Sequence, residues 1–210
     1  MHVTNFMWFC RSSFSDFFHG KTVLDIGAGD IHGNNRSLFT DCEYHGNDVV
    51  CAPNVTMVCR TKNLAFPDAY FHTIISTECF EHDPEYQESI RNACRMLKPG
   101  GLFAFTCAST HRPEHGTRRT SPSDSFGTMA DMADMQDYYK NLTIEDVQEC
   151  VDLDQIFIAW RSYYHPYFCD LYFWGIKKTR GSKPVDILLP FPYNHHDSTV
   201  IETGKNIHEK

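Results

Sequence analysis

Short apolar runs alternate with helix-like segments over the first half of the chain. Five runs have the length and composition of buried strands, and they cover residues 22–27, 44–50, 55–59, 70–76 and 102–107. Residues 84–97 place apolar side chains on one helical face, and the glycines of LKPGG follow them as a stop signal. This alternation predicts an α/β fold with a mostly parallel sheet that helices cover on both faces.

The rest of the chain follows other patterns. Residues 1–20 carry apolar residues at helical spacing and predict a helix before the first strand. Residues 108–141 are polar and show little periodicity; loops of this length in compact domains are usually functional, so we expect a lid. Thr143 has the position of a helix cap, and residues 156–163 and 170–177 predict two final, antiparallel strands.

Length and composition favour a single domain. The chain has 210 residues, of which 41% are apolar, and no run approaches the ~18 apolar residues that a membrane span needs. The N-terminus does not resemble a secretory signal, because it lacks a basic segment followed by an apolar run and a small-residue cleavage site. We expect one domain over residues 1–178, which includes the lid, and a C-terminal extension over residues 179–210 without an assigned role.

Charge and cysteine usage restrict the partners and the location. The net charge of −8 argues against nucleic acid as a partner. The nine cysteines are scattered, odd in number and contain no Cys-x-x-Cys pair. This distribution is typical of reduced cysteines that serve as small hydrophobic residues, and it favours a cytoplasmic location.

The first predicted strand leads into a glycine-rich turn. The run VLDIGAGD places Asp25 before Gly27 and Gly29, where the missing side chains let a ligand approach the backbone. A carboxylate before the glycines suits a cationic or amino ligand better than a pyrophosphate. Asp48 ends the second strand, where a carboxylate can accept both hydroxyls of a ribose. The alternative is an ordinary tight turn, with Asp25 as a helix cap and Asp48 as a turn former.

These motifs, with TECFEH after the fourth strand and LKPGG before the fifth, resemble class I S-adenosylmethionine-dependent methyltransferases of the type 11-like group over residues 20–178. The resemblance implies a Rossmann-like, doubly wound sheet of seven strands with an antiparallel last strand. It implies S-adenosylmethionine as the cofactor, with Asp25 and the glycines at its methionine part, Asp48 at its ribose and residues 60–66 beside its adenine. The implied binding set is Asp25, Gly27, Ala28, Gly29, Asp48, Val49, Leu64 and Glu78.

The heptapeptide TECFEHD gathers Glu78, Glu81 and His82 where the fourth strand ends. On a helix, these positions would project from one face, at the carboxyl edge where α/β sheets bind ligands. Two carboxylates and an imidazole suit Mg²⁺ or Mn²⁺, which would stabilise the alkoxide form of an acceptor hydroxyl. His82 would either bind the metal or take the proton. The alternative is that acidic residues merely favour the first turn of a helix.

The same pattern resembles that of metal-dependent 2′-O-methyltransferases of small RNA ends and of quinone-precursor O-methyltransferases. The RNA-type enzymes supply a further histidine from downstream, which implies His111 or His115 here, with His115 favoured as the fourth ligand. The candidate catalytic residues are His82, Glu81, His115 and His111. The candidate metal ligands are Glu78, Glu81, His82 and His115.

The expected lid also carries the arginines that bear on the acceptor. Arg112, Arg118 and Arg119 form a basic patch that suits a phosphate, a diphosphate-linked sugar or an acidic glycan, unless they are solvated loop charges. The runs TCASTHRPEHGTRRTSP, DYYKNLT and DLYFWGIKK resemble methyltransferases found beside glycosyltransferases in bacterial surface-glycan clusters and in large algal viruses.

This second resemblance implies O-methylation of a sugar hydroxyl, on a deoxyhexose such as rhamnose in a glycan, with a glycosyltransferase of the same pathway as a partner. Three alternatives stay open. They are an RNA-end ribose 2′-O-methyltransferase, a quinone or phenol O-methyltransferase, and a non-catalytic module that only binds the cofactor.

Overall fold

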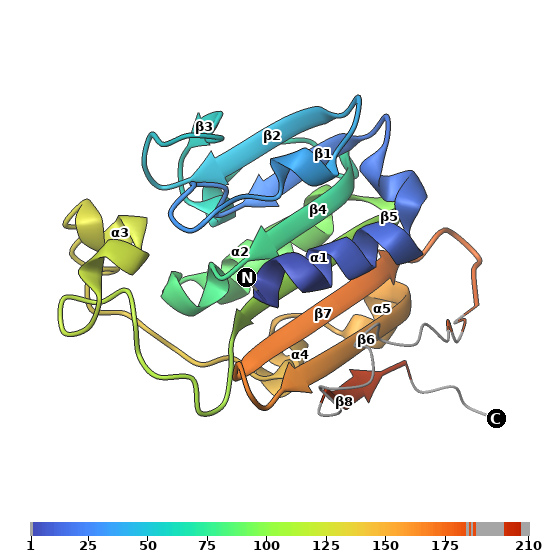
Figure 1. Cartoon of the computed structure of the whole chain (residues 1–210). Helices are drawn as coiled ribbons and strands as arrows, with labels where there is room; N and C mark the ends of the chain where they lie inside the picture. The colour runs from blue at the N-terminus through green and yellow to red at the C-terminus, as the bar shows by residue number, and fades with distance from the viewer. Residues whose placement is uncertain (1, 184, 186, 188–199, 207–210) are drawn as a thin grey trace.

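The computed structural model describes residues 2–183, 185, 187 and 200–206, and its centre is one mixed sheet (Figure 1). The order of the strands is β3-β2-β1-β4-β5-β7-β6-β8. The first five in this order are parallel to one another, while β7 is antiparallel to both of its neighbours and β8 is antiparallel to β6. Their bounds are β1 Thr22–Ile26, β2 Glu43–Asp48, β3 Met57–Val58, β4 Phe71–Thr77, β5 Leu97–Ala108, β6 Phe157–His165, β7 Asp170–Lys177 and β8 Ile201–Lys205.

Helices cover both faces of the sheet, which confirms the predicted α/β class. Successive residues of a strand point to opposite faces. On β5, Phe103 and Phe105 therefore join the apolar cluster with α2 and α4, while Leu102 and Ala104 join the cluster with α1. The α-helices are α1 His2–Ser13, α2 Tyr86–Met96, α3 Phe126–Met129, α4 Ile144–Cys150 and α5 Leu153–Ile156.

Two local predictions meet different outcomes. Thr143 caps α4 in a reciprocal capping box with Asp146, as its position before an apolar run predicts. The LKPGG segment does not separate α2 from β5, because β5 begins directly at Leu97 and contains it. The pairing of β4 with β5 shifts register across this segment, so the glycines form an irregularity within the strand.

The C-terminal extension contributes to the sheet. Asn206, just after β8, accepts a hydrogen bond from the Trp160 backbone N–H (2.6 Å) and donates to Asp154 (2.9 Å). The described residues thus form a sheet of eight strands rather than the expected seven. The apolar run DILLPFP, residues 186–192, lies outside the described residues except for Ile187.

Two expectations from composition concern membrane spans and cysteines. Within the described residues, no helix is both long enough and apolar enough to cross a membrane. All nine cysteines are described, and none of them forms a disulfide. Cys10, Cys94, Cys107 and Cys150 are buried, as expected of small hydrophobic residues.

Candidate functional site

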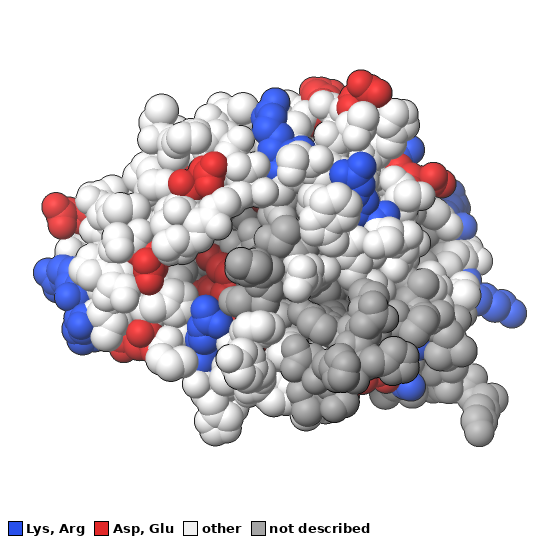
Figure 2. All heavy atoms as spheres, in the orientation of Figure 1, with Lys and Arg blue, Asp and Glu red and all other residues white. Residues whose placement is uncertain are grey.

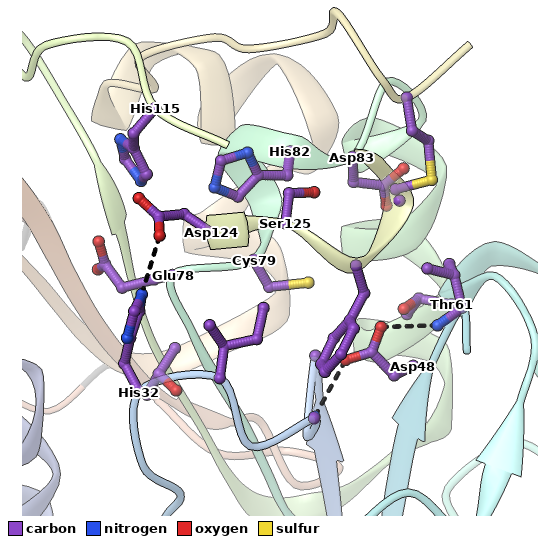
Figure 3. A pocket seen from close by; sticks show the side chains of 18 of the residues that line it. His32, Asp48, Thr61, Glu78, Cys79, His82, Asp83, His115, Asp124 and Ser125 are labelled. Carbon is purple, nitrogen blue, oxygen red and sulfur yellow. Dashed lines mark hydrogen bonds and ion pairs between the residues drawn. The ribbon is translucent and has the colours of Figure 1, made fainter. Parts of the chain in front are cut away.

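A cavity of about 650 Å³ opens at the carboxyl ends of β1, β2 and β4. Its floor comes from the glycine turn after β1 and from the residues that follow β2 and β4, and the lid segment (residues 108–141) supplies the opposite wall. Figure 3 places Asp48 and Thr61 at one end and His82, His115 and Asp124 at the other, with Cys79 between them. This is the edge at which open α/β sheets bind ligands.

The glycine turn leaves no room for side chains. Gly27 has a φ of +71°, and a Cβ there would lie 2.6 Å from both Cβ and Sγ of Cys79. A Cβ on Gly29 would lie 2.1 Å from a ring carbon of Phe126 and 2.8 Å from Asp48 Oδ2. Both glycines line the cavity, so the turn presents bare backbone to a ligand.

Asp48 lies where its sequence position predicts. Its Oδ2 accepts a hydrogen bond from the Gly29 N–H (3.0 Å) and its Oδ1 accepts one from the Val49 N–H (2.7 Å). Asp48 and Val49 both line the cavity. Burial raises the pKa of Asp48, and the two N–H donors oppose that rise. The carboxylate is thus oriented by backbone beside the glycine turn.

Asp25, which we expected at the methionine part of the cofactor, does not line the cavity. Its neighbours Leu24 and Ile26 belong to the cluster under α2, and the alternation of β1 therefore turns Asp25 to the other face. There it is 2% exposed and accepts a hydrogen bond from the hydroxyl of Tyr44. Burial raises the pKa of Asp25 to about 7.

Two further members of the expected cofactor set lie outside the cavity. Ala28 is 3% exposed, and Leu64 belongs to the apolar core because it faces inward from the chain that follows β3. Of residues 60–66, which we expected beside the adenine, Arg60 and Thr61 line the cavity. Thr61 donates to the side-chain oxygen of Asn47 (2.8 Å), which also lines the cavity.

The TECFEHD heptapeptide is not the helical turn that its spacing suggests. Glu78 has a φ of +50°, in the left-handed region, and only Phe80–His82 form a short 3-10 helix, η4. The left-handed turn directs Glu78 toward β5, where it accepts a hydrogen bond from the Thr106 hydroxyl (2.9 Å). Glu78 lines the cavity but does not join Glu81 and His82, so the four expected metal ligands do not meet.

Glu81, His82 and His115 come together. One ligand atom from each lies within 4.8 Å of the others, and the two imidazole rings are 4.9 Å apart, nearly perpendicular. Glu81 is fully buried and accepts a hydrogen bond from the Ala108 N–H (3.2 Å), while its Oε2 has no hydrogen-bond partner. The Nδ1 of His82 also has none. Two buried polar atoms without partners therefore lie in one three-residue cluster.

The electrostatics of this cluster follow from its burial. Desolvation, and then the nearby Glu78 carboxylate, raise the pKa of Glu81 well above its usual range. Desolvation, and then the nearby His115, lower the pKa of His82 to about 3. Desolvation also lowers the pKa of His115. All three shifts favour uncharged forms, as burial without a counter-charge does.

His111 lies away from the lining of the cavity. It is exposed, has a φ of +70° and does not line the cavity, whereas His115 does. The Nδ1–H of His115 donates to the carbonyl of Pro113 (3.2 Å), which leaves the Nε2 lone pair of the neutral ring for a proton or a metal. Of the two histidines considered from the sequence, His115 is the one that the fold brings to His82.

The expected basic patch is neutralised within the protein. Arg112 pairs with the buried Asp170 (3.0 Å), and Arg119 pairs with Glu114 (2.9 Å). Arg118 pairs with Asp137. The arginines are thus used to hold the lid segment and its base, which the sequence could not reveal because their partners lie up to 58 residues away.

Several lining residues were missed by the sequence analysis. His32 follows the glycine turn, Cys79 packs against it, and Asp124 and Phe126 come from the lid segment. Tyr139 does not line the cavity, but its ring lies 5.0 Å from that of His115 and 5.7 Å from that of His82. Only Cys79 carried a signal, its position after β4; the lid segment has no periodicity from which its contacts could be inferred.

Residues 24–105 match the model of a family described as a methyltransferase domain. Among curated relatives, phosphoethanolamine N-methyltransferase 2 of Caenorhabditis elegans is 27% identical over 61% of this chain and 31% of its own length. The 2-methyl-6-phytyl-1,4-hydroquinone methyltransferase of Synechocystis is 30% identical over 40% of this chain and 31% of its own length. The chain therefore spans about a third of the length of these relatives.

Among solved structures, a Burkholderia thailandensis 1,6-didemethyltoxoflavin-N1-methyltransferase with bound S-adenosylhomocysteine superposes with a TM-score of 0.57. It is 16% identical and covers 84% of this chain and 80% of its own. Residues 24–105 are therefore similar to a methyltransferase domain, and the chain has the α/β Rossmann-like fold of the class I S-adenosylmethionine-dependent methyltransferases.

Proposed function

We propose that this chain transfers a methyl group from S-adenosylmethionine to a hydroxyl of an uncharged sugar, with a divalent cation held by Glu81, His82 and His115. The observation that carries the proposal is the pair of buried, unpartnered atoms, Glu81 Oε2 and His82 Nδ1, beside His115 at one end of the cavity. Buried polar atoms normally have partners, and a cation would supply one to both.

The donor set fits Mg²⁺ or Mn²⁺. A carboxylate and two neutral imidazoles leave positions for water or for acceptor hydroxyls. The low pKa of His82, about 3, keeps its ring neutral as a ligand must be. A cation bound there would lower the pKa of a hydroxyl that it contacts.

The residues of this chain have separate tasks in the transfer. The glycine turn and Asp48 hold the nucleoside and methionine parts of the cofactor at the sheet edge. The acceptor oxygen forms a bond to the methyl carbon as the methyl–sulfur bond breaks, and S-adenosylhomocysteine leaves. With the free imidazole lone pairs used for the cation, the proton of the acceptor hydroxyl passes to water; His82, with a pKa of about 3, would in any case be too weak a base.

Charge around the cavity favours an uncharged acceptor. Glu78, Glu114 and Asp124 line the acceptor end, while the Arg112 at that end is already paired with Asp170. A phosphate or an acidic glycan would meet mainly carboxylates there. Vicinal hydroxyls of a neutral deoxyhexose such as rhamnose suit both the carboxylates and the proposed cation.

Of the alternatives, RNA ends are less well supported. On the face shown in Figure 2, lysines and arginines are interspersed with acidic residues, without the extended basic surface that phosphate backbones need. A quinone or phenol acceptor would favour a more apolar lid segment. A module that binds the cofactor without catalysis does not account for the Glu81–His82–His115 cluster at the end of the cavity.

The test compares turnover of matched variants. We expect Glu81→Gln and His82→Ala to lower methyl transfer to a rhamnose-bearing acceptor about 100-fold or more while S-adenosylhomocysteine affinity stays within about threefold. The controls are Glu88→Gln and His19→Ala, which change exposed residues outside the cavity. Wild-type turnover in either cluster variant would remove that residue from the catalytic site.

A further inference from the structure

The lid segment covers the glycine turn with an aromatic side chain. Phe126, the first residue of α3, lies so close to Gly29 that a Cβ there would be 2.1 and 2.7 Å from two of its ring carbons. The same Cβ would lie 2.8 Å from Asp48 Oδ2. The ring therefore lies over the turn, directly beside the carboxylate to which we assign the cofactor's ribose.

Two polar contacts join the lid segment to the cavity wall, one on each side of Phe126 in the sequence. His32, after the glycine turn, contacts Asp124 through Nε2 and Oδ1 at 3.2 Å (Figure 3). Arg60, on the adenine side, pairs with Asp134 at 2.7 Å. Arg60 lines the cofactor end of the cavity and His32 meets Asp124 at the other end, so the lid segment is held at both ends.

The part of the lid segment between these contacts is packed on itself. Met135 is 7% exposed, and its side chain lies so close to Gly127 that a Cβ there would be 2.8 Å away. The hydroxyl of the buried Thr128 donates to the carbonyl of Gly116. The packing of Met135 on Gly127 favours movement of this part as one body rather than of Phe126 alone, while the Thr128 contact ties it to Gly116 earlier in the lid segment.

We propose that residues 121–136 form a closed lid that competes with the cofactor, and that Phe126 is the side chain that the ribose must displace. The proposal rests on the S-adenosylmethionine site of the proposed function. A ribose hydrogen-bonded to Asp48 needs the space beside Oδ2 that the ring now occupies.

The closed lid is held weakly enough to open. The Asp134 side chain is 55% exposed and that of His32 is 75% exposed, so solvent screens both contacts. A ligand that binds only the open form has its affinity reduced by the fraction of molecules that are open. Removing a closing contact should therefore tighten ligand binding and speed association.

The experiment measures S-adenosylhomocysteine binding to the full chain by calorimetry and by surface plasmon resonance. We expect Phe126→Ala to bind about fivefold more tightly or better, with the gain in the association rate. Asp134→Asn, which leaves Phe126 and the cavity lining intact, should gain about two- to threefold by the same route. Asp131→Asn, an exposed residue of the same part, is the matched control and should bind as the wild type does.

Whether Phe126→Ala binds S-adenosylhomocysteine more tightly or more weakly decides whether the Phe126 ring must leave the site or packs on the bound cofactor. If Phe126 instead packs on the bound cofactor, Phe126→Ala will bind more weakly and dissociate faster, which overturns the proposal. Equal affinity in all variants overturns it as well. Failure of every variant and of the wild type to bind S-adenosylhomocysteine would overturn the proposed cofactor site, and this inference with it.

Discussion

Replacing Asp25 by asparagine should make the protein less sensitive to rising pH. The carboxyl group of Asp25 is 2% exposed, its Oδ1 has no hydrogen-bond partner, and burial raises its pKa from 3.8 to about 7. A carboxyl group whose pKa is raised in the folded state stabilises that state fully below pH 3.8, and this contribution is lost as the pH rises through about 7. Asparagine is neutral throughout and keeps an oxygen that can accept from Tyr44.

The size of the effect follows from the same pKa values. A tenfold change in proton affinity is worth about 1.4 kcal/mol, so the rise from 3.8 to about 7 corresponds to about 4 kcal/mol of lost stability at high pH. About 3 kcal/mol of this loss falls between pH 5 and pH 8.5. The amide N–H₂ of asparagine lacks a partner at the position of Oδ1, which lowers the stability of the variant by about 1–3 kcal/mol at every pH.

Urea unfolding of both proteins at pH 5 and at pH 8.5 tests this reasoning. The stability of Asp25→Asn relative to the wild type should rise by about 3 kcal/mol between the two pH values. Asp41→Asn, which changes an exposed aspartate, should show no such rise. Parallel pH dependences of wild type and Asp25→Asn would refute the raised pKa. Because Asp25 does not line the cavity, the variant should also bind S-adenosylhomocysteine within about threefold of wild type.

Three other substitutions test separate parts of the structure. Asp48→Asn should weaken S-adenosylhomocysteine binding about tenfold or more in calorimetry, since a charged acceptor of the ribose hydroxyls is lost. Unchanged affinity would mean that the ribose does not bind at Asp48. Arg112→Met should lower the free energy of unfolding by about 3 kcal/mol in urea, because the buried Asp170 loses its ion pair; a neutral result would mean that Asp170 is satisfied without it. Asn206→Ala should lower the free energy of unfolding by about 1–3 kcal/mol, since the buried Trp160 N–H loses its acceptor. Unchanged stability would mean that the contacts of Asn206 after β8 do not stabilise the fold.

The strands and their order of appearance could be predicted because local patterns determine them. Apolar runs of five to seven residues mark β1 and β4, and the capping residue Thr143 marks the start of α4. β8 escaped prediction because its sequence, IETGK, is mostly polar and exposed, so it carries no apolar pattern. Its place in the sheet depends on pairing with β6, which lies about 40 residues earlier.

Part of the candidate site could be predicted as well, namely the part that local sequence patterns determine. Gly27, Gly29 and Asp48 lie on a turn and at a strand end, whose geometry follows from nearby sequence. Glu78 was placed on a helical face, and its positive φ turns it away toward Thr106 instead. Contacts of the lid segment depend on partners far along the chain, and no local pattern encodes them.

The most direct test of the proposed function is release of S-adenosylhomocysteine by metal-stripped protein with a rhamnose-bearing acceptor, measured with and without added Mn²⁺ or Mg²⁺. We predict turnover only when the cation is added, and loss of that response in Glu81→Gln. Equal turnover in the presence of a chelator would contradict the role assigned to Glu81, His82 and His115.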